Sequence, residues 1–253
     1  MDLQLKGSRV LVTGGTRGIG RAIVEAFADE GAVVEFCARD AGEIESTEKA
    51  LADRGANVSG VRLDVRDGVA LRGWVEAAAE RMGGLDAVVA NISALAIPDT
   101  EENWYAGFET DLMHTVRLSQ AALPYLEASG RGSIVAIASV SGREADFAAG
   151  PYATMKTAIL GYIKGLAFQL AGRGVRANVV SPGNTYFEGG FWHGAERNMP
   201  DLYASQLAQN PTGRMGRPEE MARAVVFLAS PVSSFTTGAH LVVDGALTRG
   251  IQL

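Results

Sequence analysis

Short apolar runs of strand length alternate with segments of helical spacing along the whole chain, and this alternation constrains the fold more than any other feature. The apolar runs lie at residues 8–14, 33–38, 58–65, 85–93, 133–139, 175–183 and 240–245. Strands that alternate with helices form crossover connections and hence a parallel sheet with helices on both faces. We therefore predict an α/β fold, a single doubly wound domain with a seven-stranded parallel sheet flanked by helices.

One segment, at about residues 184–215, departs from this pattern. It is rich in Gly, Asn, Pro and aromatic residues, and its periodicity is weak. Such a segment is typical of an insertion or a lid rather than of a sheet element. No linker, repeat or shift in composition divides the chain, so we expect residues 1–253 to form one domain that carries this lid.

Composition and charge exclude several classes of protein. Hydrophobic residues make up 47% of the chain and charged residues 21%, which is ordinary for a folded protein and argues against disorder. The net charge of −6 makes nucleic acid and anionic membranes poor candidates as partners. With a single cysteine, Cys37, no internal disulfide can form. We find no signal-peptide pattern and no apolar run long enough for a membrane span, and we expect a cytoplasmic protein.

A glycine-rich turn follows the first apolar run and opens the first helical segment. Residues 13–20 read TGGTRGIG. Backbone N–H groups in such a turn approach a pyrophosphate, and the helix N-terminus adds a favourable dipole. The alternative is a tight turn without a ligand, but the first βα unit is the context that the motif requires. We predict a dinucleotide site of the Rossmann kind, formed here by Gly14, Thr16, Arg17, Gly18, Ile19 and Gly20.

The end of the second run bears on the choice between NAD and NADP. NAD sites usually place an acidic residue there, whereas an arginine favours the 2′-phosphate of NADP. This chain has Arg39, and Arg17 of the glycine turn can converge on the same phosphate. Asp40 can instead pair with Arg39, and both arginines can be solvated surface residues. We favour NADP(H) and keep NAD(H) open.

Tyr152 and Lys156 lie four residues apart in the segment YATMK, so a helix places both on one face. A free tyrosine titrates at about pH 10. A nearby ammonium stabilises the phenolate and makes a tyrosine useful as an acid or base at neutral pH. Ser139 ends the fifth run, where its hydroxyl can bind a substrate carbonyl oxygen, and Ser141 is a rival candidate. The alternative for the Tyr/Lys pair is an ordinary amphipathic face.

Taken together, these motifs resemble the short-chain dehydrogenase/reductase family. The resemblance rests on TGGTRGIG, on Ser139 with YATMK, on NIS after the fourth run and on VRANVVSPG, and it covers essentially the whole chain. Within the family the chain looks most like the 3-oxoacyl-carrier-protein reductase type, in part through the ending HLVVDGALTRG.

The resemblance implies hydride transfer between NADP(H) and a carbonyl or secondary alcohol. Tyr152 then acts as the general acid/base, Lys156 assists it and holds the nicotinamide ribose, and Ser139 orients the substrate oxygen. The further cofactor contacts that the resemblance implies are Asp64 and Val65 at the adenine, Asn91 beside the adenine ribose, and Pro182, Gly183 and Thr185 at the nicotinamide carboxamide. From its residues alone, Asp64 can accept from an adenine amino group or be only a turn residue. A homotetramer is the family's usual assembly.

Three positions depart from the family pattern. The fourth run is followed by Asn91-Ile92-Ser93 rather than by Asn-Ala-Gly. Asp111 stands where the family has an asparagine whose backbone carbonyl holds a proton-relay water. The carbonyl of Asp111 can serve equally, while its charged side chain can alter the relay. Phe187 replaces a threonine that contacts the cofactor, and we expect an apolar wall there.

The lid segment holds many large side chains, although only 7% of the chain is aromatic. They are Tyr186, Phe187, Phe191, Trp192, Met199 and Tyr203. They can enclose an apolar or ring-bearing substrate, or they can pack the lid onto the body or another subunit. His193 lacks the companions of a metal ligand, so we predict no metal site. We interpret His114 and His240 as structural and Cys37 as buried and inert.

Three other functions compete with an NADP(H)-linked carbonyl reductase or alcohol dehydrogenase. A non-catalytic dinucleotide-binding regulator would not need the set of Ser139, Tyr152 and Lys156. An NAD-dependent alcohol dehydrogenase differs in its cofactor. An enoyl reductase is disfavoured because family members of that kind space the tyrosine and the lysine further apart. We expect a small-molecule carbonyl or alcohol substrate, and neither nucleic acid nor membrane as a partner.

Overall fold

The computed structural model describes residues 2–251, which contain a parallel sheet in the order β3-β2-β1-β4-β5-β6-β7. Its strands are β1 (Arg9–Thr13), β2 (Val33–Ala38), β3 (Val58–Arg62), β4 (Ala87–Ala90), β5 (Ser133–Ile137), β6 (Arg176–Pro182) and β7 (His240–Val243). The predicted α/β fold with a seven-stranded parallel sheet is therefore confirmed. The strand order reverses between β1 and β4, and such a reversal is where α/β sheets bind ligands.

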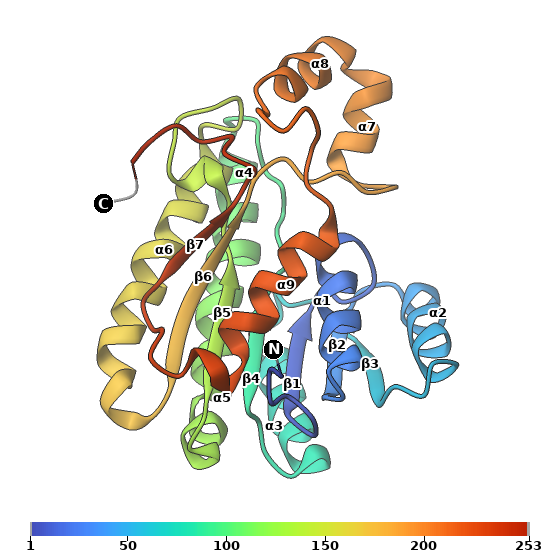
Figure 1. Ribbon diagram of the computed structural model, residues 1–253, viewed down its shortest axis with the longest axis vertical. Coiled ribbons are helices and arrows are strands. Elements are labelled where there is room, and N and C mark those ends of the chain that lie inside the picture. Colours follow the sequence, from blue (N-terminus) through green and yellow to red (C-terminus); the bar gives the residue numbers. More distant parts are fainter. Residues whose placement is uncertain (1, 252–253) are drawn as a thin grey trace.

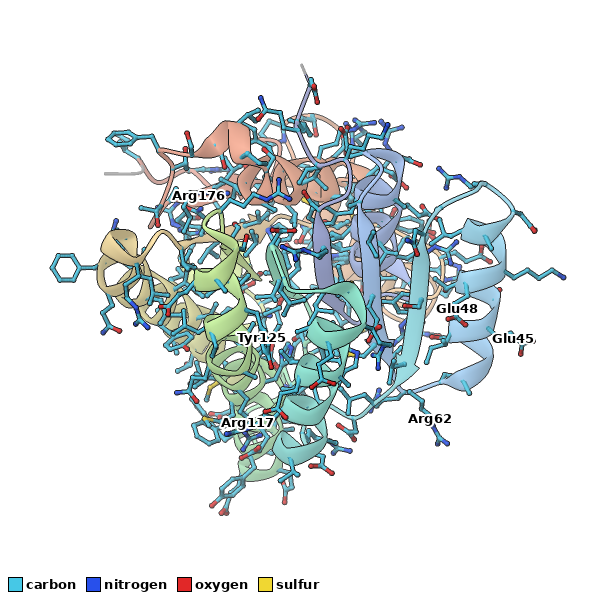
Figure 2. All side chains as sticks on the ribbon, turned by 90° about the horizontal axis from the view of Figure 1, so that it is seen from below. Glu45, Glu48, Arg62, Arg117, Tyr125 and Arg176 are labelled. Carbon is cyan, nitrogen blue, oxygen red and sulfur yellow. The ribbon has the colours of Figure 1, made fainter. Side chains whose placement is uncertain are left out.

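Helices cover both faces of the sheet (Figures 1 and 2). One face carries α1 (Gly18–Asp29), α2 (Ala41–Ala52) and α9 (Pro218–Ala229), and the other carries α3 (Gly68–Met82), α5 (His114–Ser129) and α6 (Pro151–Leu170). A hydrophobic cluster fills each interface. Strands β4 and β5 are buried along their whole length, as their uninterrupted apolar sequences predict for a sheet covered on both faces.

The helical region between β4 and β5 is not one regular α-helix. Helix α4 (Glu101–Gly107) continues into a π-helical stretch at Phe108–Met113 before α5 begins. Apolar spacing cannot reveal this stretch, because a single π turn shifts the helical register only locally. Such turns occur frequently at functional sites, and this one carries Asp111.

Strand β3 ends at Arg62, three residues earlier than the apolar run predicts. The chain turns there because the Asp64 carboxylate accepts a hydrogen bond from the backbone N–H of Arg66, at 3.0 Å. On the same edge strand, Glu48 of α2 accepts from the backbone N–H of Gly60 at 2.8 Å. Both Glu48 and Arg62 are labelled in Figure 2. A carboxylate in this place removes one donor that a foreign strand could otherwise pair with.

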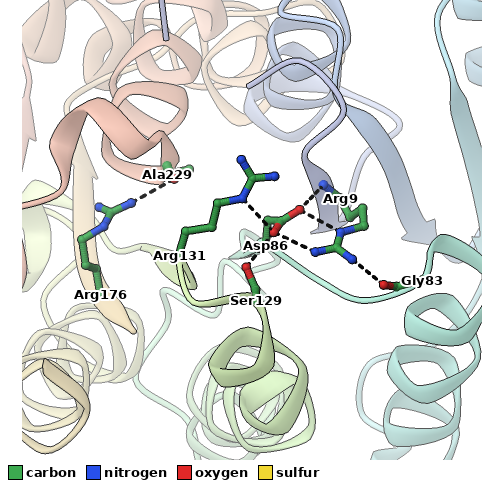
Figure 3. A network of polar contacts seen from close by, with 7 residues as sticks. All are labelled: Arg9, Gly83, Asp86, Ser129, Arg131, Arg176 and Ala229. Atoms are coloured by element: carbon green, nitrogen blue, oxygen red, sulfur yellow. Dashed lines mark hydrogen bonds and ion pairs between the residues drawn. The ribbon is translucent and has the colours of Figure 1, made fainter. Parts of the chain in front are cut away.

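A polar network holds the sheet together at the amino ends of its strands (Figure 3). Asp86, just before β4, accepts hydrogen bonds from Arg9 of β1, from Ser129 at the end of α5 and from Arg131. Burial alone would raise the pKa of the Asp86 carboxyl, but these hydrogen bonds outweigh it and hold the pKa well below its usual range. Arg176 lies near this network, and its guanidinium donates to the carbonyl of Ala229 at the end of α9.

The lid segment, residues 184–215, forms two short helices, α7 (Phe191–Asn198) and α8 (Pro200–Ala208). They lie together beyond the carboxyl ends of the strands, in orange at the top of Figure 1. Apart from an isolated bridge between Thr185 and Gly216, the segment adds nothing to the sheet. Within residues 2–251, the helices are all too short or too polar to cross a membrane.

Candidate active site

A cavity of about 710 Å³ lies where the strands end. Most residues that we singled out from the sequence line it: Gly14, Thr16, Arg17, Ile19, Gly20, Arg39, Asp64, Val65, Asn91, Ser139, Tyr152, Lys156, Pro182, Gly183 and Thr185. Gly18 and Asp111 stand just outside this lining. The fold thus gathers into one cavity residues that follow β1, β2, β3, β4, β5 and β6 in the sequence.

The glycine turn after β1 forms a cradle that side chains would fill. Gly14 and Gly18 have φ angles of +74° and +54°, a region that favours glycine. A Cβ at Gly20 would overlap the carbonyl oxygen of Gly14. Asn91, just after β4, supports the turn, because its Nδ2 donates to the carbonyls of Thr13 at 3.0 Å and of Gly14 at 3.3 Å. A bare backbone cradle at the start of α1 fits the pyrophosphate of a dinucleotide.

Arg39 lines the cavity beside the first turn of α2. Asp40, its alternative partner, caps α2 instead, because its carboxylate accepts from the backbone N–H of Glu43 at 2.8 Å. The Glu43 carboxylate in turn accepts from the Thr16 hydroxyl at 2.7 Å. Arg39 is therefore accompanied in the cavity by a carboxylate that the sequence did not indicate.

The Asp64 side chain is held by Arg66, two residues further along the chain. The Arg66 guanidinium forms hydrogen bonds to both of its carboxylate oxygens, and these lower the pKa of Asp64, with a smaller contribution from the charge of Arg39. The carboxylate remains an acceptor at the cavity wall, beside Val65.

Tyr152 and Lys156 are both on α6, which begins at Pro151. The Lys156 Nζ lies 5.6 Å from the centre of the Tyr152 ring, so the two side chains share one face of the helix as predicted. The Lys156 side chain is 2% exposed, and its Nζ donates to the carbonyl of Ile137 at 3.1 Å.

Asp111 turns its carboxylate toward Lys156. Oδ1 lies 3.1 Å from the Lys156 Nζ, and both side chains are almost fully buried. Oδ2 accepts from the backbone N–H of Ala94 at 2.9 Å. The Asp111 carbonyl, to which the family resemblance gave the relay role, accepts from the hydroxyl of Thr115 at 2.7 Å. The charged side chain is therefore the part of Asp111 that contacts Lys156.

Ser139 and Ser141 both line the cavity, just after β5. The Ser139 Oγ accepts from the backbone N–H of Ser141 at 3.2 Å, and its hydroxyl donates to the Ser141 Oγ at 3.3 Å. The Ser141 hydroxyl donates to the carboxylate of Asp146 at 2.6 Å.

Comparisons with known proteins agree with this geometry. A family model described as "Enoyl-(Acyl carrier protein) reductase" matches residues 14–248. The chain is 39% identical to isoepoxydon dehydrogenase of Aspergillus clavatus over 98% of its own length and 97% of that protein. It is 35% identical to the 3-oxoacyl-[acyl-carrier-protein] reductase of Vibrio cholerae, over 97% and 99% of the two chains. The chain belongs to the short-chain dehydrogenase/reductase family.

Solved structures of the family have the same fold. An NADPH-bound short-chain oxidoreductase from Pseudomonas aeruginosa, described as containing an atypical catalytic centre, superimposes with a TM-score of 0.87 at 32% identity, covering 97% of this chain and 100% of that one. The predicted family is therefore confirmed, and this chain is an oxidoreductase of the NAD(P)-dependent short-chain type.

The part of the cavity lining that follows β6 begins with Pro182 and Gly183, at the end of that strand. The backbone N–H of Gly183 donates to the carbonyl of Val243 at 3.0 Å. Phe187 then places its ring against the glycine turn. A Cβ on Gly18 would lie 2.5 Å from that ring, and one on Gly190 would lie 2.7 Å from it.

Aromatic rings from two parts of the chain meet at the cavity. Phe147, in the loop before α6, stacks on Phe191 with 6.0 Å between ring centres and makes an edge contact of 5.4 Å with Trp192. All three line the cavity. Tyr186, which is not part of this lining, contacts His193 and Tyr203, and Met199 is exposed. The lid segment thus divides its large side chains between the cavity and its own packing.

The histidines and the cysteine take structural positions. His114 is buried and its Nε2 lies 3.0 Å from the Thr13 hydroxyl, and the His240 Nε2 lies 2.6 Å from the Ser181 hydroxyl. The His193 Nδ1 accepts from the backbone N–H of Gly189 at 3.0 Å. Cys37 is buried, and burial raises the pKa of its thiol to about 12. Within residues 2–251, the side chains suited to metal binding form no group of three or more.

Several residues around the site could not be singled out from the sequence, among them Glu43, Ala94, Asp146 and Phe147. Glu43 is three residues from the helix cap Asp40, and Ala94 contributes only a backbone N–H. Asp146 and Phe147 lie in a loop without periodicity, between Ser141 and Tyr152. Their position between two candidate catalytic residues was the one signal in the sequence that could have drawn attention to them.

Proposed function

We propose that this protein reduces a ketone, or oxidises the corresponding secondary alcohol, with NADP(H) as cofactor. The observation that carries the proposal is the convergence of Ser139, Tyr152 and Lys156 on one cavity with the glycine cradle. A protein that only binds the dinucleotide has no need for a proton donor with an ammonium beside it. When bound, the nicotinamide ring supplies or accepts the hydride.

Each of the three side chains has a defined task at the substrate oxygen. Tyr152 gives a proton to that oxygen during reduction and takes it back during oxidation. Lys156 stabilises the phenolate form of Tyr152 and holds the nicotinamide ribose. Ser139 donates a hydrogen bond to the same oxygen and so fixes its position. Asp111 acts through Lys156, which its carboxylate contacts at 3.1 Å.

The rest of the cavity holds the dinucleotide. The turn from Gly14 to Gly20, with Thr16, Arg17, Gly18 and Ile19, takes the pyrophosphate, and Asn91 keeps that turn in shape. Arg39 and Arg17 bind the 2′-phosphate, which favours NADP(H) over NAD(H). Asp64 and Val65 lie against the adenine, and Pro182, Gly183 and Thr185 hold the carboxamide with their backbone. The carboxylate of Glu43 next to Thr16 is the feature that most favours NAD(H) as an alternative.

The substrate is compact and ring-bearing in this proposal. Phe147, Phe191 and Trp192 present flat apolar surfaces in the cavity that also holds Ser139 and Tyr152. Such surfaces suit a ring that carries a carbonyl at one edge. Residues 184–215 act as a lid that keeps water away from the reacting atoms.

A homotetramer is the proposed assembly, and a single domain of residues 1–253 is its building block. Several large apolar side chains are exposed, among them Tyr105 on α4 (65%), Phe168 on α6 (90%) and Phe235 before β7 (103%). Where such side chains gather into a contiguous patch, the patch is typical of a subunit contact. Sedimentation equilibrium measures the mass directly, and a monomer at micromolar concentration would contradict the assembly.

Enoyl reduction is the competing chemistry, because the matching family model bears that description. The four-residue spacing of Tyr152 and Lys156 and the identity with a named dehydrogenase and a named 3-oxoacyl reductase support a carbonyl substrate instead. A panel of cyclic ketones and α,β-unsaturated thioesters distinguishes the two reactions.

The test is oxidation of NADPH in the presence of this panel. We expect turnover of ketones that falls by a factor of about 10²–10⁴ in Tyr152→Phe, because the proton donor is gone. Binding of NADPH, followed by its fluorescence, should survive the substitution. Tyr125→Phe, on α5 and labelled in Figure 2, is a matched control outside the cavity lining. Nucleotide binding without any turnover by the wild type would favour the regulator.

A further inference from the structure

Asp146 stands two hydrogen bonds away from Ser139, with Ser141 between them. The distances are 2.6 Å from the Ser141 Oγ to Asp146 Oδ2 and 3.3 Å from the Ser139 Oγ to the Ser141 Oγ. Ser139 and Ser141 are buried, with exposed fractions of 7% and 8%, and Asp146 is partly buried behind them. Ser141 lines the cavity and Asp146 does not, so the carboxylate reaches the site through Ser141.

Each hydroxyl has one proton to donate, and this limits what the two serines can do. An ionised carboxylate only accepts, so the short contact with Asp146 commits the proton of Ser141. The Ser141 Oγ is then left as an acceptor toward the cavity. Ser139 donates to it across a long 3.3 Å contact, while the Ser139 Oγ is held by the backbone N–H of Ser141. The proton of Ser139 is therefore the weakly held one, free to turn toward a substrate oxygen.

We propose that Asp146 is a positioning residue that reserves the Ser139 hydroxyl for the substrate oxygen by holding the proton of Ser141. The proposal rests on the function proposed above and settles the rivalry between the two serines. Without the carboxylate, Ser141 can donate its proton to the Ser139 Oγ or directly to the substrate oxygen. Both arrangements draw the substrate oxygen away from the geometry that Ser139 and Tyr152 share.

Asp146 also shapes its own loop, which determines how it can be tested. Its Oδ1 accepts from the backbone N–H of Ala148 at 2.8 Å, and its backbone carbonyl accepts from Ala149 at 3.1 Å. Asp146→Asn keeps an oxygen for Ala148 and turns an amide N–H₂ toward Ser141. The amide donates to the Ser141 Oγ, so the proton of Ser141 is released while the loop, with Phe147, keeps its shape.

The experiment is a double-mutant cycle of Asp146→Asn and Ser141→Ala, with kcat and KM measured for a ketone that the wild type reduces. We expect Asp146→Asn alone to lower kcat about tenfold and to change the ketone KM less than about threefold, since one competing hydrogen bond is gained. Ser141→Ala should lower kcat about threefold, because Ser139 loses an acceptor but keeps its backbone donor. Adding Asp146→Asn to Ser141→Ala should then lower kcat no further.

Equal effects of Asp146→Asn in both backgrounds would overturn the proposal, because the carboxylate would then act independently of Ser141. A change in melting temperature with kcat intact would also overturn it, since the role would be structural. Asp53→Asn, an exposed aspartate at the end of α2, controls for the loss of a charge. If Asp146→Asn does not fold, the two serine variants provide the test. The kcat of Ser139→Ala must then be at least tenfold lower than that of Ser141→Ala.

Failure of the proposed function gives a different result. In that case the wild type reduces no ketone, or Tyr152→Phe reduces it equally well, and the positioning role falls with it. Failure of the positioning role alone leaves an active enzyme that depends on Tyr152 and shows additive effects in the cycle.

Discussion

Lys156 and Asp111 form an ion pair inside the protein, with 3.1 Å between Nζ and Oδ1 and with side-chain exposures of 2% and 1%. The pair joins α6 to the π-helical stretch at Phe108–Met113, and the N–H of Ala94 ties the other carboxylate oxygen to the loop after β4. A buried pair of this kind costs free energy to desolvate, and it costs more when one partner is removed.

We predict that Asp111→Ala lowers the free energy of unfolding by about 3–5 kcal/mol, because it leaves the Lys156 charge buried without a partner. Urea unfolding measures this change. Asp111→Asn keeps an acceptor for the backbone N–H of Ala94, so its free energy of unfolding should fall by less. Glu109→Ala is the matched control in the same π-helical stretch. Its partner Arg117 is partly exposed, so the loss should stay below about 1 kcal/mol. An Asp111→Ala protein as stable as this control would contradict the prediction.

Arg39→Asp should move the cofactor preference toward NADH. The substitution removes a guanidinium from the 2′-phosphate site and adds a carboxylate beside Glu43, which repels a phosphate and accepts from a ribose hydroxyl. The measurement is the ratio of kcat/KM for NADPH to that for NADH, which we expect to fall at least tenfold. Arg54→Asp makes the same change in charge beyond the other end of α2 and should leave the ratio as it is. An unchanged ratio in Arg39→Asp would contradict the proposed binding of the 2′-phosphate by Arg39.

Gly18→Ala should impair cofactor binding and leave most of the fold in place. Its φ of +54° strains any other residue, and the added methyl group would meet the Phe187 ring at 2.5 Å. We expect the Kd for NADPH, measured by fluorescence titration, to rise at least tenfold. Gly73→Ala is the matched comparison within helix α3, where a Cβ meets nothing within 4 Å. It should raise the free energy of unfolding by about 0.5–1 kcal/mol. Equal NADPH affinity in the two variants would contradict this account of the cradle.

Stability should fall as the pH drops from 6.5 toward 4. Burial lowers the pKa of His114 to about 4 from the ordinary value of 6.5, the nearby Lys156 adds to this, and Asp111 opposes it. Within this window the unfolded chain binds a proton at His114 that the folded protein excludes, so lowering the pH favours unfolding. The loss is about 1.4 kcal/mol per pH unit for one such histidine.

Half-buried His240, whose pKa is also lowered to about 4, contributes in the same direction. His114→Gln should therefore reduce the slope of unfolding free energy against pH between 6.5 and 4, without abolishing it. The slope comes from urea unfolding at several pH values. Parallel slopes in the variant and the wild type would show that His114 is protonated in the folded protein.

Periodicity and turn chemistry were enough to predict the sheet and the glycine turn after its first strand. Apolar runs gave all seven strands, and TGGTRGIG gave the turn, because both depend on residues that are close in sequence. The contacts that the sequence does not reveal join residues from different elements. Asp111 of the π-helical stretch contacts Lys156 of α6, and Phe147 of the loop before α6 contacts Phe191 of the lid segment. A helical pattern indicates which face is apolar, but it does not determine which charge faces which, and it does not reveal a single π turn.

The residues that flank β4 make different kinds of contact at its two ends. Asp86, just before it, gathers the arginines that brace the amino side of the sheet, and Asn91, just after it, supports the glycine turn. The contacts that brace the sheet and the residues of the candidate site thus lie at opposite ends of the same strand. Substitutions meant to change the substrate therefore belong among the lid residues that line the cavity, and substitutions meant to raise stability belong around Asp86, at the other end of the strands.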